Sequence, residues 1–188
     1  MMRCRLFAGL FLELLIASAA SAQGSYKLAP APLPSGSDIP AALAALLQSN
    51  GNRVVDATGA PVCEVWLGNA IPLKASAASS ADVMYGGLEF GTLVGVLHFP
   101  QPGSDFRGQA IKPGYYTLRY ALVPQDGNHM GVNPTRDFVL MSPVAQDTQL
   151  EKALKFEDLT KLSKQASGTN HQGREGATIS VPRNSSFK

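Results

Sequence analysis

Chemically useful side chains gather between Gln125 and Phe138, where the sequence reads QDGNHMGVNPTRDF. The stretch holds carboxylates, an imidazole, a thioether and a guanidinium. Imidazole nitrogens suit copper or zinc, and a thioether favours Cu(I). One hypothesis is therefore a copper or zinc ion bound by His129, with His98 and neighbouring acids as further ligands. Against it, the three histidines of the chain show no close spacing typical of a metal site. We therefore expect no cofactor, and keep as the alternative a metal-binding protein or metal-dependent enzyme that uses His129 and neighbouring acids.

The same stretch is typical of a loop between two strands. Asp126-Gly127 and Asn133-Pro134 are turn formers, and loops held by rigid strands often display binding residues. We therefore expect a ligand or partner to bind a surface built by Asp105 to Arg107 and Asp126 to Asp137. The candidate ligand-binding residues are Asp105, Arg107, Arg119, Asp126, His129, Arg136 and Asp137.

A purely structural role for these residues is the competing interpretation. Charge-assisted hydrogen bonds can order a loop without any ligand. Arg136 would then pair with Asp137 and Arg119 with Asp105, while Asp126 would bond its own turn. By the same reasoning His98, which follows two valines on one strand, is expected to be a core residue with its polar atoms satisfied rather than a ligand.

Enzyme motifs do not stand out, and we expect a binding protein rather than an enzyme. The chain has no G-x-S-x-G elbow, and its glycines do not form a phosphate-binding loop or a dinucleotide fingerprint. A groove lined by aromatic rings, for a sugar or a peptide, is a further hypothesis. Tyr116 and Tyr120 share one face of a strand and Tyr115 lies on the other, so at least one of these sets is expected in the core. Trp66 and Phe106 would complete such a groove.

The first 22 residues have the order of a secretory signal peptide. Arg3 and Arg5 precede an apolar run from Leu6 to Ile16, and Ala20-Ser21-Ala22 provides an A-x-A cleavage site. We expect an exported protein, periplasmic or extracellular, with no transmembrane segment after cleavage. Residues 23–37, rich in Pro, Ala and Ser, are expected to be an extended or mobile leader, and residues 38–188 to form a single domain.

The net charge and the cysteine content limit the classes of partner that the protein can have. Without Arg3, Arg5 and Glu13 the basic residues fall from 16 to 14 and the acidic ones from 14 to 13, which leaves a net charge of +1. That balance argues against nucleic acid and against a polybasic membrane patch. Cys63 is then the only cysteine, and we expect it to be a small buried residue on a strand. An unidentified small molecule or protein remains as the partner.

Hydrophobic periodicity predicts a mainly β fold with a helix near each end. A helix capped by Asp38 is expected to stop at Asn50-Gly51, with Leu43, Leu46 and Leu47 buried. A hairpin turns at Thr58-Gly59, and the apolar run to Phe99 is a strand buried on both faces. Later strands are expected over residues 115–123 and 137–141, a helix over 148–168 that is broken near Lys155, and an edge strand over 177–181. This order is typical of an antiparallel β-sandwich or partly open barrel with a short N-terminal helix and a C-terminal helix.

The segment from Gly95 to Asp147 also resembles a family of uncharacterised exported bacterial proteins. The matching motifs are DFRGQ, KPGYYTLRY, PQDGNHMG and RDFVL, followed by a later acid. The resemblance covers about half of the chain after the signal peptide, and it implies export and a β-sandwich. It carries no known reaction, so it assigns no catalytic residue.

Overall fold

The computed structural model describes residues 26–36, 38–75, 80, 82–104, 108–123, 135–167 and 178–180. The expected signal peptide lies outside these ranges, as does most of the QDGNHMGVNPTRDF stretch. Among the described residues, no helix is both long and apolar enough to cross a membrane.

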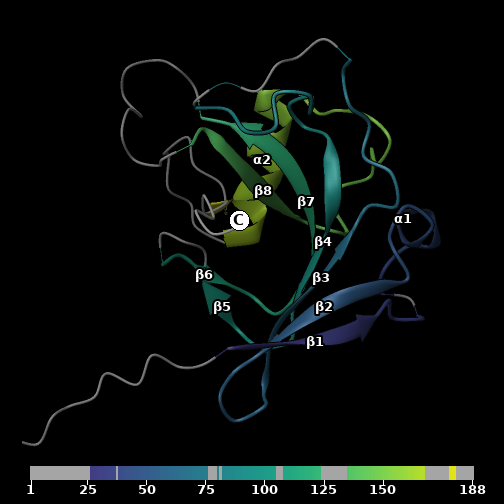
Figure 1. Cartoon of the computed structure of the whole chain (residues 1–188), viewed down its shortest axis with the longest axis vertical. Helices are drawn as coiled ribbons and strands as arrows, with labels where there is room; N and C mark the ends of the chain where they lie inside the picture. Colours follow the sequence, from purple (N-terminus) through teal and green to yellow (C-terminus); the bar gives the residue numbers. More distant parts are fainter. Residues whose placement is uncertain are drawn as a thin grey trace, which may run out of the picture.

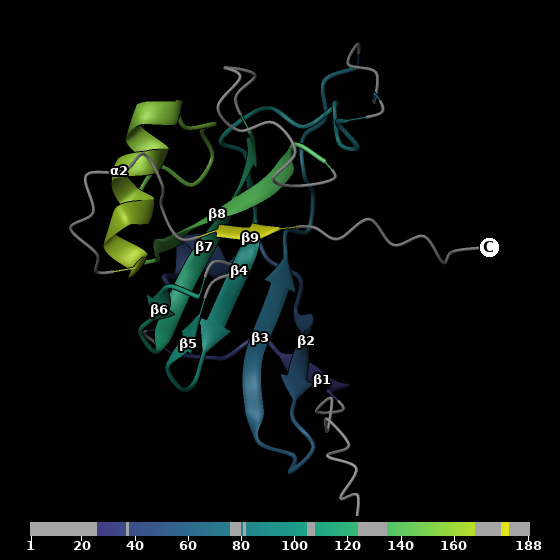
Figure 2. The same ribbon diagram turned by 90° about the vertical axis from the view of Figure 1, so that its left-hand side faces the viewer.

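The fold is mainly β, as predicted, and is built on one antiparallel sheet of seven strands in the order β1-β2-β3-β4-β7-β8-β9. A second sheet pairs β5 with β6. The sheet does not close into a barrel, because β1 (labelled in Figure 1) and β9 (labelled in Figure 2) are its two edges. The strands are β1 (Lys27–Pro32), β2 (Asn50–Val55), β3 (Pro61–Leu67), β4 (Leu93–Phe99), β5 (Gly103–Ser104), β6 (Ala110–Ile111), β7 (Gly114–Leu122), β8 (Asp137–Pro143) and β9 (Thr178–Ser180), and the helices are α1 (Ala41–Ala44) and α2 (Phe156–Ser167).

The large sheet is covered on both faces, which gives the sandwich-like layering. Strands β4 and β7 pair at its centre and are mostly buried on both sides, as the apolar run ending at Phe99 predicts. One face packs Leu97, Tyr116 and Leu118 against Ile111 of β6 and Ala166 of α2. On the opposite face, Trp66 of β3 and Val96 of β4 pack against Leu43, Leu47 and Val144. Figure 2 shows α2 beside β8, at the far end of the sheet from β1.

The N-terminal edge differs from the expected mobile leader. Residues Lys27 to Pro32 are extended, as predicted, but they pair with β2 as an edge strand. Prolines are tolerated there because an edge strand leaves one row of N–H groups without a ladder partner. Ala31 is fully buried, and its carbonyl accepts a hydrogen bond of 2.9 Å from the indole Nε1 of Trp66. The packed domain therefore begins before Asp38.

The first helix is shorter than predicted, a single turn from Ala41 to Ala44. After it, the backbone bonds to the end of β3: Gln48 N–H donates to the Leu67 carbonyl at 2.9 Å and Asn69 N–H to the Leu46 carbonyl at 2.8 Å. These sheet-like bonds replace the i→i−4 helical bonds that alanine and leucine propensity favours. Leu43 and Leu47 are buried as predicted, while Leu46 is only half-buried.

The second helix begins later than predicted, at Phe156 rather than near Thr148. In a helix, the carbonyls of Gln149 and Lys152 would accept from N–H groups four residues later. Here both carbonyls accept from the buried guanidinium of Arg119 instead, at 2.8 and 2.9 Å. The Thr148–Glu151 pattern therefore does not start a helix, because a tertiary contact holds this segment in another conformation.

Gly91, in the turn before β4, is a position where both the backbone conformation and a close contact demand glycine. Its φ is +82°, and a Cβ built there would lie 2.0 Å from the Leu154 carbonyl oxygen. The close approach lets Leu154 N–H donate to the Gly91 carbonyl at 3.3 Å and Gly91 N–H donate to the Tyr120 carbonyl at 2.7 Å. Residues 150–154 can therefore lie directly against the turn.

We predict that Gly91→Ala destabilises the fold much more than Gly59→Ala. Gly59 also has a positive φ of +87°, but no atom lies within 4 Å of the position that an alanine methyl group would occupy. Gly59→Ala should therefore cost only the left-handed strain of about 1–2 kcal/mol. Gly91→Ala should cost a further amount of about 1–3 kcal/mol, because the methyl group meets fixed backbone. Urea unfolding measures both, and equal losses would contradict the assigned contact.

Candidate functional site

The sequence-predicted site residues divide into two groups. Asp105, Arg107, Asp126 and His129 lie outside the residues that the structure describes. The four that are described, Arg119, Arg136, Asp137 and His98, do not form one cluster. Each has its own set of protein partners.

Arg119 lies on β7 and is completely buried. Its Nε donates to Asp147 Oδ2 at 2.7 Å and its Nη2 to Asp147 Oδ1 at 2.9 Å, a bidentate pair. Nη1 donates to the carbonyls of Gly91 at 2.6 Å and Lys152 at 2.9 Å, and Nη2 also donates to that of Gln149 at 2.8 Å. A guanidinium has five N–H groups, so these acceptors use them all and none is left for a ligand.

The acid opposite Arg119 is Asp147, where the structural interpretation of the sequence expected Asp105. Asp147 Oδ2 also accepts from the hydroxyl of Thr117 at 2.6 Å. Both side chains of the ion pair are fully buried, and an ion pair of this kind is stable only when its hydrogen bonds are satisfied. The pair therefore fixes residues 147–152 and the Gly91 turn against the sheet.

Asp137 and Arg136 also take separate partners instead of pairing with each other. The buried carboxylate of Asp137 accepts from the backbone N–H groups of Met84 at 2.7 Å and Tyr85 at 3.1 Å, and from the Tyr120 hydroxyl at 2.6 Å. Burial, and then this hydrogen bond, raise the pKa of Tyr120. Arg136 Nε donates to the Val123 carbonyl at 2.8 Å, and its Nη1 lies 3.6 Å from Asp82. Asp137 thus anchors residues 84–85 to the start of β8.

His98 is held by Glu64 on the sheet face that also carries Trp66. Its Nδ1 lies 2.8 Å from Glu64 Oε2, and its ring stacks on that of Tyr115 with the centroids 4.1 Å apart. Arg53 Nε lies 2.6 Å from the other oxygen of Glu64. This is the satisfied, largely buried histidine that the structural interpretation expects. Burial raises the pKa of Glu64, but the hydrogen bonds from His98 and Arg53 outweigh it and hold that pKa below its usual value.

Neither the metal hypothesis nor the aromatic groove gains support from the described side chains. Within the described ranges, no group of three or more His, Cys, Asp or Glu residues gathers in a way that could hold a metal ion; His129 lies outside them. Tyr116, Tyr120 and Trp66 are buried in the core, so they cannot line an open groove. Cys63 is half-buried on β3, and burial raises the pKa of its thiol.

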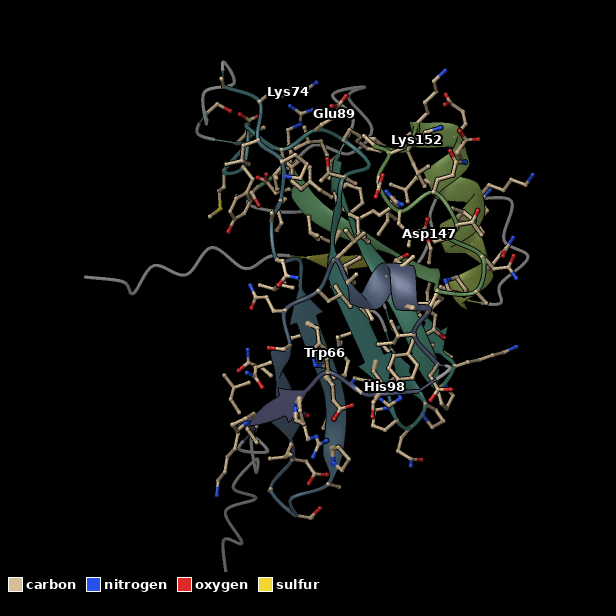
Figure 3. All side chains as sticks on the ribbon, turned by 90° about the vertical axis from the view of Figure 1, so that its right-hand side faces the viewer. Trp66, Lys74, Glu89, His98, Asp147 and Lys152 are labelled. Atoms are coloured by element: carbon tan, nitrogen blue, oxygen red, sulfur yellow. The ribbon has the colours of Figure 1, made fainter. Side chains whose placement is uncertain are left out.

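A groove that the sequence analysis missed lies at the end of the sheet near the Gly91 turn. It consists of two cavities: the main cavity, which is lined by more residues, has a volume of about 300 Å³, and a second cavity of about 350 Å³ adjoins it. The two cavities share Leu46, Leu150, Glu151 and Lys152. Lys74 and Glu89 form part of the rim of the main cavity, and Figure 3 shows them with Lys152 at one end of the molecule, away from Trp66 and His98. Leucines and smaller residues line the main cavity together with four charged residues, Lys74, Glu89, Glu151 and Lys152.

The walls of the groove are tied to one another by backbone bonds. Lys74 N–H donates to the Gly87 carbonyl at 2.8 Å, and Leu73 and Leu88 form an isolated β-bridge, so the wall made of residues 68–74 is fixed to residues 87–88. Arg119 fixes the two other walls, through the carbonyls of Gly91 and Lys152. The groove is therefore preformed, and no motif signals it because its leucines come from four separate segments.

Comparison of the chain with protein-family models, with curated proteins and with solved structures finds no significant match.

We predict that Asp147→Asn lowers the free energy of unfolding by about 3–5 kcal/mol, because it leaves the buried Arg119 charge uncompensated. Glu89→Gln is the matched control. It removes one partner of an exposed ion pair, Lys74 Nζ to Glu89 Oε1 at 3.2 Å, and should cost less than about 1 kcal/mol. Chemical unfolding measures both variants. A loss for Asp147→Asn no larger than that of the control would contradict the role given to the buried pair.

We predict that Glu64→Gln changes how stability depends on pH. Since the folded-state pKa of Glu64 is lowered, the ionised carboxylate stabilises the fold fully above its ordinary pKa, and this contribution is lost as pH falls through the lowered value. The stability difference between wild type and Glu64→Gln should therefore shrink as pH falls from 7 toward 3 in a series of urea titrations. A difference that stays constant or grows on acidification would show that the carboxylate is not stabilised by Arg53 and His98.

Proposed function

We propose that the protein is an exported, non-catalytic binding protein that holds a small, mainly apolar molecule in the groove between residues 68–74, 89–93 and 150–153. The proposal of export rests on the charged, apolar and small residues of the first 22 positions. The compartment would be the periplasm or the exterior.

The observation that carries the proposal is the preformed, leucine-lined groove. Ligand sites are concave and mostly apolar, with a few polar groups that fix orientation, and a volume of about 300 Å³ is at the lower end of their usual range. The main cavity has that volume. Because Arg119 and the Leu73–Leu88 bridge already hold the walls in place, a ligand would not have to supply the free energy of ordering them.

The position of the charged groups favours binding over catalysis. A general base must lie within hydrogen-bond reach of its substrate. The one His–carboxylate pair among the described residues, His98 with Glu64, does not line either cavity of the groove. On the rim, Lys74 and Glu89 neutralise each other. These side chains are suited to orient a ligand.

We predict that the neutral fluorescent dye N-phenyl-1-naphthylamine, which has apolar rings and no charge, binds the mature protein at one saturable site and that Leu73→Ser weakens this binding. Leu73 lines the groove and is 70% exposed, so its removal should lower affinity about three- to tenfold without unfolding the protein.

Leu28→Ser is the matched control, because Leu28 is 74% exposed on β1 and does not line the groove. Its fluorescence titration should match that of wild type. Equal effects of the two substitutions, or binding that does not saturate, would refute the groove as the binding site.

A further inference from the structure

The charges around the groove limit the kind of ligand that it can take. The rim carries two cations, Lys74 and Lys152, and two anions, Glu89 and Glu151. Lys74 Nζ and Glu89 Oε1 are 3.2 Å apart and form an ion pair. Among the described residues, no ion pair engages Glu151 or Lys152. Within that part of the chain, one anion and one cation therefore stand without an ion-pair partner where the rim borders both cavities.

Leucine side chains lie beside these two charges. Leu46 and Leu150 line both cavities, and Leu93 lines the main one. Leu46 comes from the chain after α1, and its side chain is only half-buried although the helical pattern would bury it. An apolar ligand body placed here would remove leucine surface from water, which is the main favourable contribution to binding in such a groove.

We propose that the groove binds a zwitterion with an apolar body, which is the chemistry of an apolar amino acid or of a short apolar peptide with free ends; this rests on the proposed binding function. The ligand's carboxylate would lie beside Lys152, its ammonium group beside Glu151, and its side chain on Leu46 and Leu150. A purely anionic ligand would meet the uncompensated Glu151, and a purely cationic one would meet Lys152. Only a ligand carrying both charges matches the rim at each end.

Calorimetric titration of the mature protein with four compounds tests the charge requirement. These compounds are leucine, leucyl-leucine, N-acetylleucine, which lacks the ammonium group, and leucine amide, which lacks the carboxylate. Because both rim charges are exposed, each match should be worth at most about fivefold in affinity. The zwitterions should bind more tightly than both blocked compounds. Tighter binding of leucyl-leucine than of leucine would identify the ligand as a peptide that spans both cavities. Tighter binding of leucine would identify it as a free amino acid.

Three substitutions assign the charges to residues. Lys152→Gln should abolish the preference for leucine over leucine amide but keep the preference for leucine over N-acetylleucine. Glu151→Gln should abolish the preference over N-acetylleucine and keep the preference over leucine amide. Lys155→Gln is the control, since Lys155 is exposed on the same segment but lines neither cavity, and it should keep both preferences. Blocked compounds that bind as well as leucine, or three variants that behave alike, would overturn the inference.

The dye separates this inference from the proposed function. If N-phenyl-1-naphthylamine binds in a manner sensitive to Leu73→Ser but no zwitterion binds or competes with it, the groove is a ligand site and the inferred ligand class is wrong. If the dye shows no saturable site either, both are wrong.

Discussion

A single buried guanidinium determines how two loops, the one before β4 and the one before α2, lie against the sheet. Arg119 projects from β7, at the centre of the sheet, into a region with no access to water. Taking a charge out of water is costly unless every donor finds an acceptor, and here the acceptors are Asp147 and three backbone carbonyls. Those carbonyls belong to loops before β4 and before α2. The need to satisfy the guanidinium therefore prescribes where both loops lie.

Several other features follow from this constraint. Residues 148–155 are held outside a helix where the carbonyls of Gln149 and Lys152 turn to Arg119, and α2 starts at Phe156. Gly91 must be glycine because its carbonyl reaches the guanidinium while the Leu154 backbone packs where a Cβ would be. Because these loops are held in place, the leucines between them do not collapse onto one another, and their side chains remain partly exposed. The same interaction thus holds both loops against the sheet and gives the groove its shape.

Sequence reasoning succeeded where structure depends on near neighbours in the chain. The turn at Thr58-Gly59, the alternation along β7 and the doubly buried β4 were all predicted, because they follow from turn chemistry and a period of two. It failed where a residue far away in the sequence determines the local conformation. Arg119 and Asp147 are 28 residues apart, and neither spacing nor composition singles out that acid. The groove could not be predicted either, since its lining is ordinary leucine from four segments, whereas the polar stretch that attracted attention lies mostly outside the described residues.

The central claim is that Arg119 makes the loops before β4 and before α2 part of the cooperative core. Native-state amide hydrogen exchange tests it directly, because it reports the free energy of the opening that exposes each N–H group. The amides of Gly91 and Leu154, which bond to the carbonyls of Tyr120 and Gly91, should exchange only through global unfolding, with the same free energy as the amides at the centre of β4 and β7. Exchange of Gly91 and Leu154 through a local opening of much lower free energy would contradict the claim.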